Sequence, residues 1–193
     1  MIFEKDEICN DILKNSILQN EEDIDTDTNT DTDTNIHTFV KNILKYFERC
    51  SREINIIYIQ SLLSDSNNNI AFYCIDTDFD INNFPSAIIY QKKHTKMKDE
   101  ITYYILLIFT VTKYRNMGYA TIMLDKFIEY ILKKHTSKQK IKFILSSTEN
   151  AFTFYLYSGF ELTQDLLSDH KILTKYERND KNKEHYIFKL LIN

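Results

Sequence analysis

The sequence predicts a mixed α/β fold in which strands and helices alternate over most of the chain. Apolar residues make up 43% of its 193 residues, which is enough to bury the core of one domain of this length. Their spacing switches between a period of two, typical of strands, and a period near 3.6, typical of helices. The clearest switch lies between residues 101–111 and residues 118–132. We therefore expect a single α/β domain over residues 1–193.

Two amphipathic helices are predicted near the amino terminus. Apolar residues recur at helical spacing from Ile8 to Ile17, and more strongly from Ile36 to Cys50 after a candidate cap at Asn35. Between them, residues 20–35 repeat Asp, Thr and Asn and contain no basic residue. Such a segment cannot fill a core, so we predict a disordered acidic loop at residues 20–35.

Three strands are predicted in the middle of the chain. Residues Ile70 to Asp76 and Ala87 to Gln91 form the first two, with a turn near Pro85 between them. Ile101 to Val111 forms a longer and more apolar strand. The pattern from Ile54 to Leu63 fits a strand and a helix equally, and both alternatives stay open.

The carboxy-terminal half continues the alternation. A helix is predicted to begin near Gly118, with an ion pair between Glu129 and Lys133 one turn apart. A strand over residues 141–146 follows, then a short helix from Thr148 to a left-handed cap at Gly159. Residues 186–192 form a closing strand. The predicted buried face of the Gly118 helix consists of Ala120, Met123, Leu124, Phe127, Ile128, Ile131 and Leu132.

Charge and composition exclude several classes of partner. The formal net charge is −4, and without the acidic segment at residues 20–35 it is +3, too weak a balance to indicate nucleic-acid binding. No apolar run approaches the roughly 20 residues of a membrane-spanning helix, and the charged start does not fit a signal peptide. Three distant cysteines lack metal-ligand spacing, so we expect no metal, buried thiols, and a cytoplasmic or nuclear location.

Glycine marks the expected ligand site. The chain has only two glycines where average usage would give about 13, and these are Gly118 and Gly159. Gly118 lies where the long strand turns into a helix, and the unpaired N–H groups of a helix start bind phosphate. Lys113 and Arg115 add positive charge, and no acid precedes Asp125 in the helix. The turn is therefore suited to an anionic ligand, although a strand–helix turn of purely structural importance is the alternative.

Two segments resemble motifs of the GCN5-related N-acetyltransferase (GNAT) superfamily. Residues 114–120, Tyr-Arg-Asn-Met-Gly-Tyr-Ala, resemble its acetyl-CoA motif Arg/Gln-x-x-Gly-x-Gly/Ala. Residues 151–160, Ala-Phe-Thr-Phe-Tyr-Leu-Tyr-Ser-Gly-Phe, resemble its Ala-x-x-Phe-Tyr-x-x-x-Gly-Phe segment. The resemblance covers about residues 86–160. It implies a three-layer fold: a mixed, mostly antiparallel sheet that splays between its fourth and fifth strands, with helices on both faces.

The resemblance also implies how acetyl-CoA would bind. Its pantetheine arm would meet the end of the long strand, and its pyrophosphate would meet the turn at Gly118. Many members place Asn three residues before the alanine of the second motif; Thr148 stands there and Asn150 is displaced, so a neighbouring hydroxyl would replace that contact. The residues expected to contact acetyl-CoA are Phe109, Thr110, Val111, Arg115, Asn116, Met117, Gly118, Tyr119, Ala120, Thr121, Thr148, Asn150 and Tyr155.

The same resemblance assigns the catalytic roles. Tyr155 would be the acid that protonates the leaving thiolate, against the alternative of a buried core aromatic. Tyr104, eleven residues before Arg115, matches the tyrosine with which protein N-terminal acetyltransferases hold a catalytic water. Some of those enzymes pair it with a histidine where this chain has Phe143. Tyr176, in an expected loop over residues 161–185, and His185, at its end before the last strand, are candidates for the general base and for contact with the substrate.

These features together predict an enzyme that transfers acetyl from acetyl-CoA to a primary amine by direct attack. The favoured acceptor is a protein amino terminus, and an auxiliary subunit would fit that branch. A polyamine, an amino sugar phosphate or a lysine side chain are alternative acceptors. An inactive CoA-binding module is a further alternative, because the general base is not evident. The acidic segment would border the acceptor entrance or have no function.

Overall fold

The computed structural model describes residues 2–4, 40–48, 55–75, 83–94, 99–136, 139–177 and 184–192. The helix predicted from Ile8 to Ile17 and the acidic loop at residues 20–35 lie outside these ranges. A helix over residues 40–48 falls within the segment predicted from Ile36 to Cys50. None of the described helices is long and apolar enough to cross a membrane.

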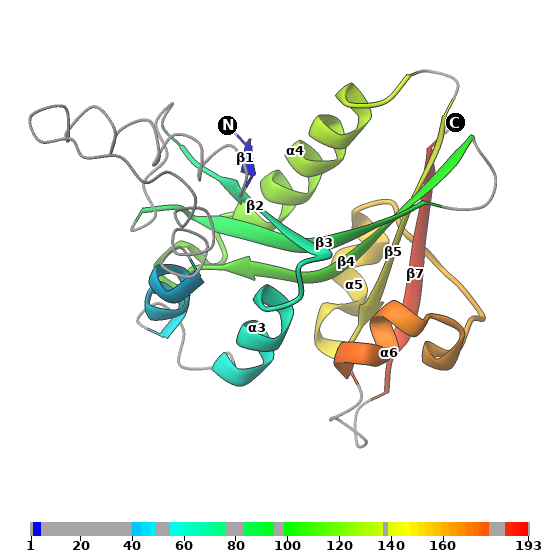
Figure 1. Cartoon of the computed structure of the whole chain (residues 1–193). Helices are drawn as coiled ribbons and strands as arrows, with labels where there is room; N and C mark the ends of the chain where they lie inside the picture. Colours follow the sequence, from blue (N-terminus) through cyan, green and yellow to red (C-terminus); the bar gives the residue numbers. More distant parts are fainter. Residues whose placement is uncertain are drawn as a thin grey trace, which may run out of the picture.

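The described strands form one seven-stranded sheet in the order β1-β2-β3-β4-β5-β7-β6 (Figure 1). Only β4 and β5 are parallel neighbours among them; every other described pair is antiparallel. This is the mixed, mostly antiparallel sheet that the sequence predicted. The strands are β1 (Ile2–Glu4), β2 (Asn68–Tyr73), β3 (Ser86–His94), β4 (Glu100–Thr110), β5 (Lys140–Ser147), β6 (Glu161–Leu162) and β7 (Tyr186–Ile192).

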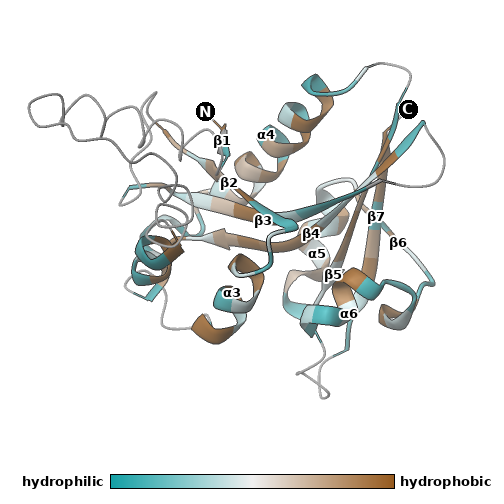
Figure 2. Ribbon diagram, viewed as in Figure 1, coloured by the Kyte–Doolittle hydropathy of each residue, from teal (hydrophilic) through white to brown (hydrophobic). Residues whose placement is uncertain are grey.

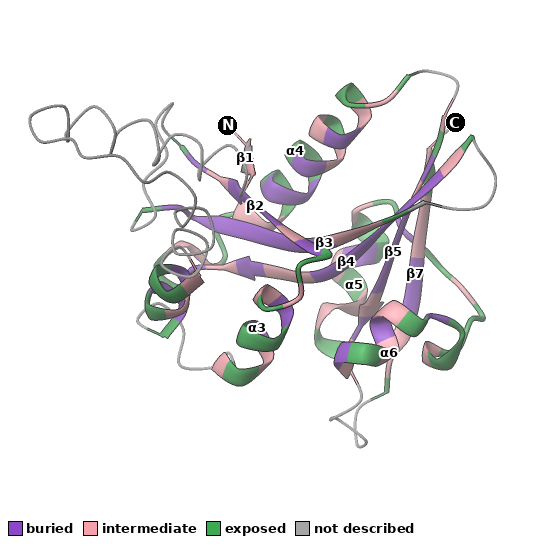
Figure 3. Cartoon of the chain, in the orientation of Figure 1, coloured by how far each residue is buried: buried purple, intermediate pink, exposed green. Residues whose placement is uncertain are grey.

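Helices cover both faces of the sheet, so the fold has three layers. One face packs against the helix at 40–48 and against α3 (Ile56–Leu63) and α6 (Lys171–Glu177). The other packs against α4 (Tyr119–Lys133) and α5 (Glu149–Tyr157). Two short 3-10 turns, η1 (Thr112–Tyr114) and η2 (Leu167–Asp169), complete the described elements. Figures 2 and 3 show that the apolar and buried parts of these helices face the strands.

Most of the predicted elements are confirmed. α4 begins at its cap Gly118 and buries Met123, Leu124, Phe127 and Ile131. The predicted ion pair joins Lys133 Nζ to Glu129 Oε1 at 2.6 Å. The ambiguous segment at 54–63 is helix α3, because the Asn55 side chain accepts hydrogen bonds from the N–H groups of Ile57 (3.0 Å) and Tyr58 (3.3 Å).

The expected loop over residues 161–185 was wrong in one respect. It contains β6, η2 and α6, and Tyr176 therefore lies on a helix rather than in a loop. α6 has only seven residues, and two of them, Leu173 and Tyr176, are buried. Such a short helix offers fewer than two turns of periodic pattern, so sequence periodicity does not separate it from a loop.

Candidate functional site

The site lies where β4 and β5 separate. Their parallel pairing runs from Glu100 opposite Lys140 to Ile105 opposite Leu145 and ends there. β4 nevertheless continues to Thr110 along its other neighbour, β3. The predicted splay between the fourth and fifth strands is thus confirmed, and the two strands diverge in Figure 1. Past Ile105, one edge of β4 has no strand beside it among the described residues.

A β-bulge coincides with this separation. The register of β3 and β4 shifts from Tyr90 opposite Ile105 to Ile89 opposite Leu107, which leaves Leu106 as the extra residue. A bulge bends the strand and increases its twist, so it turns the end of β4 away from β5. The bulge is therefore the local cause of the opening.

The backbone beyond the bulge presents hydrogen-bonding groups to the open edge. The Val111 N–H donates to Pro85 O at 2.9 Å, on the β3 side, and in an antiparallel strand the main-chain groups of successive residues point to opposite sides. Phe109 accordingly accepts a 2.6 Å bond at its carbonyl from Ser86 Oγ. The main-chain groups of Ile108 and Thr110 therefore face the open edge. Of the residues predicted to meet pantetheine, Thr110 fits by this geometry; the roles of Phe109 and Val111 stay predictions.

The turn before α4 has the features of an anion site. Gly118 adopts φ +81° and caps the helix, and its carbonyl accepts the first helical bond from Ile122 N–H at 3.0 Å. The N–H groups of Tyr119, Ala120 and Thr121 precede that bond and have no partner within the helix. No acidic side chain occupies the first turn. These donors, together with the helix dipole, suit a phosphate.

The remaining residues of the turn are arranged around these donors. Asn116 also has a positive φ, 61°, and Met117 is exposed. A Cβ added to Gly118 would meet nothing within 4 Å, so glycine is required there by its φ rather than by crowding. The Arg115 Nε donates to Thr110 O at 3.4 Å, which holds this side chain beside the end of β4.

Tyr155 is held in α5 by the end of that helix. Phe160 N–H donates to Tyr155 O and Gly159 N–H donates to Leu156 O, each at 3.1 Å, with Gly159 at φ +83°. This pair of bonds is a Schellman motif, and the rings of Tyr155 and Phe160 supply its apolar contact. The left-handed cap predicted at Gly159 is confirmed. Thr148 caps the other end of the helix without a side-chain bond, and Asn150 is exposed.

The Tyr155 phenol is buried, and its pKa responds to the charge of Glu177, a residue on the opposite face of the sheet. Burial, and after it the charge of Glu177, raise the pKa of Tyr155. Tyr155 in turn raises the pKa of Tyr58 on α3. Tyr155 lies on α5, which covers one face of the sheet, while α3 and α6 cover the other. Its hydroxyl keeps its proton throughout the physiological pH range.

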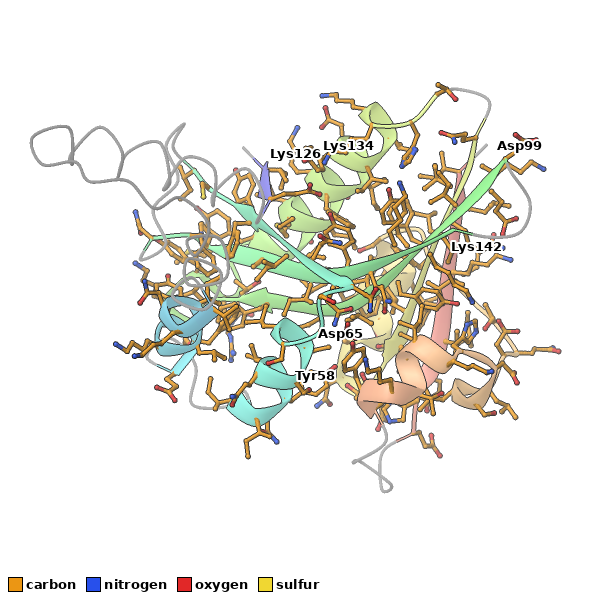
Figure 4. The ribbon with its side chains drawn as sticks, viewed as in Figure 1. Tyr58, Asp65, Asp99, Lys126, Lys134 and Lys142 are labelled. Atoms are coloured by element: carbon orange, nitrogen blue, oxygen red, sulfur yellow. The ribbon has the colours of Figure 1, made fainter. Side chains whose placement is uncertain are left out.

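A polar cluster that sequence reasoning missed lies on the α3 and α6 side of the gap between β4 and β5; Figure 4 shows Tyr58 there. The Tyr58 hydroxyl lies 3.2 Å from Leu106 O and 3.2 Å from Glu177 Oε1. Burial, followed by the charge of Glu177, raises the pKa of Tyr58. The Tyr58 hydroxyl thus lies between the carbonyl of the bulge residue and an acid on α6. No sequence signal pointed to Glu177, because its helix was expected to be a loop.

His185, predicted as a substrate contact, joins this cluster from the segment before β7. Its Nδ1 lies 2.9 Å from Ser146 Oγ and 3.9 Å from Glu177 Oε2. Its Nε2 is buried and has no hydrogen-bond partner among the described residues. Leaving a buried polar atom unpaired costs about 1–3 kcal/mol, so such an atom in a site calls for a ligand or water as its partner.

The other two predicted tyrosines have defined partners. Tyr104 is buried and its hydroxyl lies 3.4 Å from His170 Nδ1, while His170 Nε2 lies 3.1 Å from Asp165 Oδ2. A histidine thus accompanies Tyr104, although it comes from the residue before α6 and not from β5. The Tyr176 hydroxyl bonds to Asp65 and accepts a 2.8 Å bond from Asn68 Nδ2. Its predicted contact with substrate stays a prediction.

No group of three or more potential metal ligands occurs among the described residues. The polar groups described at the site are main-chain N–H donors, phenols, a carboxylate and an imidazole.

Comparison with solved structures finds the same fold in acetyltransferases. Tetrahymena Gcn5 aligns with a TM-score of 0.52 and 16% identity, over 88% of this chain and 97% of the other. Arabidopsis thaliana NAA60, solved with acetyl-CoA, aligns with a TM-score of 0.52 and 13% identity, over 81% and 94%. Arabidopsis thaliana Naa50, solved with the bisubstrate analogue CoA-Ac-MVNAL, aligns with a TM-score of 0.50 and 16% identity, over 79% and 92%.

No protein-family model matches the chain, and no curated protein matches its sequence. The likeness is therefore one of structure, at identities that establish the fold alone. It agrees with the two sequence motifs and with the splay between β4 and β5. The chain has the fold of the GNAT acetyltransferases.

Proposed function

We propose that this chain is an acetyl-CoA-dependent N-acetyltransferase that acts on a primary amine, with a protein amino terminus as the favoured acceptor. The observation that carries the proposal is the opening between β4 and β5. It combines the edge of β4 that no strand covers among the described residues, a helix start at α4 without a side-chain cap, and the Tyr155 phenol. These groups match a ligand that has an extended amide arm, a pyrophosphate and a thioester.

Each group has a part in the proposed reaction. The N–H groups at the start of α4 bind the pyrophosphate, and Thr110 bonds to the pantetheine arm. The amine nitrogen attacks the acetyl carbonyl, and a main-chain N–H near Ile108 stabilises the oxyanion. The carbon–sulfur bond then breaks, and Tyr155 donates its proton to the leaving thiolate. The amine is thereby acetylated and CoA leaves as a thiol.

The choice of acceptor rests on resemblance and on the neighbours. Tyr104 holds the catalytic water in this proposal, as the matching tyrosine does in protein N-terminal acetyltransferases. Naa50 was solved with an analogue that joins CoA to a peptide beginning Met-Val, and it shares this fold. Both points favour a peptide amine over a small molecule.

Release of CoA from acetyl-CoA in the presence of different amines tests the proposal. The panel consists of peptides with free amino termini, blocked peptides with an internal lysine, polyamines and glucosamine 6-phosphate. Turnover with free amino termini alone is the expected result. Turnover with a small amine alone would replace the favoured acceptor. CoA binding without any turnover would identify an inactive CoA-binding module and reject the enzyme.

A further inference from the structure

His185 lies where several elements of the site meet. Its Nδ1 is 2.9 Å from Ser146 Oγ at the end of β5 and 3.9 Å from Glu177 Oε2 on α6. Glu177 in turn is bonded at 3.2 Å by Tyr58 of α3 and acts electrostatically on Tyr155 of α5. The imidazole is thus part of a cluster that borders the gap between β4 and β5.

The ring has one nitrogen with partners and one without. Ser146 Oγ lies within hydrogen-bond distance of Nδ1, whereas Glu177 Oε2, at 3.9 Å, acts on that side of the ring through its charge. This arrangement favours a proton on Nδ1, which leaves a lone pair on Nε2. The Nε2 atom is buried and unpartnered among the described residues, and the side chain as a whole is 9% exposed.

The other histidines with described side chains differ in this respect. His170 uses Nδ1 toward the Tyr104 hydroxyl and Nε2 toward Asp165. His135 uses Nε2 toward the Tyr103 hydroxyl and Nδ1 toward Gln139. Within the described part of the chain, His185 alone combines a buried ring, an orienting carboxylate and an unpartnered nitrogen. Those are the features of a general base.

We propose that His185 is the general base of the acetyl transfer, with Glu177 and Ser146 as its positioning residues; the inference rests on the proposed function. As the amine nitrogen bonds to the acetyl carbon, its proton moves to His185 Nε2. The electron pair of the broken carbon–sulfur bond goes to sulfur, which takes the proton of Tyr155. The imidazolium later releases its proton, and the phenol regains one from solvent. The Glu177 carboxylate stabilises the imidazolium while it exists.

The charged and titratable groups around the ring come from several elements. Glu177 faces it from α6, with Tyr58 and Tyr155 behind that carboxylate. Glu184 precedes it in the chain and accepts a 2.6 Å bond from the Tyr186 hydroxyl. A nearby carboxylate favours the protonated imidazole. Removing the charge of Glu177 therefore removes the group that stabilises the imidazolium formed during the reaction.

The pH dependence of kcat/KM for the full-length protein tests this role, with the best amine of the panel and with CoA affinity measured in parallel. We expect His185→Asn to lower kcat/KM at neutral pH by about 100-fold, to remove the acidic limb of the profile, and to leave CoA affinity unchanged. Glu177→Gln should lower kcat/KM by about tenfold, because the imidazolium formed in the reaction loses its neighbouring carboxylate. His135→Asn, a matched histidine outside the cluster, should retain the rate and the profile.

The results separate this inference from the proposed function. If His185→Asn keeps its rate within about twofold and keeps the acidic limb, His185 is not the base, although the acetyl transfer stands. Loss of the limb in His170→Asn instead would assign the base to the Tyr104 pair. If His185→Asn no longer binds CoA, Glu177→Gln decides: a kcat/KM lowered about tenfold with CoA affinity retained supports the role of His185, and an unchanged kcat/KM rejects it. No turnover by the unaltered protein with any amine would overturn both the proposed function and this role.

Discussion

At the scale of single residues, the site depends on which side chains carry a proton, and burial keeps the proton on two of its tyrosines. Tyr155 and Tyr58 are phenols whose pKa is raised first by burial and then by the charge of Glu177. Both keep their protons at neutral pH, so each acts as a donor. His185, whose buried Nε2 has no partner among the described residues, is the proposed acceptor. Donor and acceptor therefore come from different elements and meet at one gap in the sheet.

Tyr155→Phe is expected to lower kcat by about 100-fold and to leave CoA affinity unchanged, because only the proton donor is removed and the ring contact with Phe160 remains. Steady-state kinetics and direct CoA titration measure the two effects. Tyr157→Phe is the control, since that side chain lies on the same helix and is 90% exposed. An equal loss of rate and CoA affinity would contradict the role of Tyr155 as the acid.

At the scale of elements, the start of α4 combines a left-handed glycine with an anion site. The φ of +81° at Gly118 disfavours every residue with a Cβ, while the space beyond it is open. Strain and charge can therefore be separated by substitution. The strain costs about 1–2 kcal/mol and is shared by all non-glycine residues at this position.

Gly118→Glu is accordingly expected to weaken CoA binding about tenfold more than Gly118→Gln, because only glutamate sets a negative charge against the phosphates. Calorimetric titration of CoA into both variants gives the comparison, and circular dichroism checks that they are equally folded. The extra loss should shrink at high salt. Equal affinities of the two variants would remove the phosphate site from this turn.

Helix α6 is fastened to the loop before β2 by an ion pair. Asp65 accepts bonds from Lys175 and Tyr176, and both lower the pKa of its carboxyl; Figure 4 shows Asp65 between α3 and α6. The pKa of Asp65 is lower in the folded protein than in the unfolded chain, where it is about 4, so the charged carboxylate stabilises the fold above that pH. This stabilisation is lost as the pH falls through the folded pKa.

Asp65→Asn should therefore reduce the free energy of unfolding at pH 7 by about 2 kcal/mol and flatten the fall in stability below about pH 4. Urea unfolding at a series of pH values measures both changes. Because α6 also carries Glu177, the variant should lose catalytic rate as well. An acidic stability limb identical to that of the unaltered protein would show that Asp65 does not hold α6.

At the scale of the whole molecule, the sheet is opened at its centre, where β4 and β5 share only part of their length. Acetyl-CoA in the gap would bridge the two halves of the sheet, and a ligand that binds only the folded state stabilises it. We expect CoA at about 100 times its Kd to raise the free energy of unfolding by about 2.7 kcal/mol. Thermal unfolding should show a smaller rise with adenosine 3′,5′-bisphosphate, which lacks the pantetheine arm. Equal shifts would place the arm outside the gap.

The sequence predicted those parts of the fold and site that have a local cause. The start of α4 at Gly118, the cap at Gly159 and the strand at 101–111 each follow from residue type and period. The site residues that were missed, Tyr58, Ser146 and Glu177, come together only through the sheet and through α6. His170 beside Tyr104 was missed for the same reason, because 66 residues separate them along the chain.

The bulge at Leu106 has a consequence for how β4 tolerates change in length. Tyr104 and Leu106 belong to the core on the α3 side, yet beyond the bulge Phe109 and Val111 occupy that side, so the phase of alternation is reversed. β4 therefore consists of two regularly alternating segments of opposite phase that meet at Leu106. Deleting Leu106 would restore regular alternation from Tyr104 to Val111, with Phe109 and Val111 still on the α3 side, and would remove the bulge that bends the end of β4.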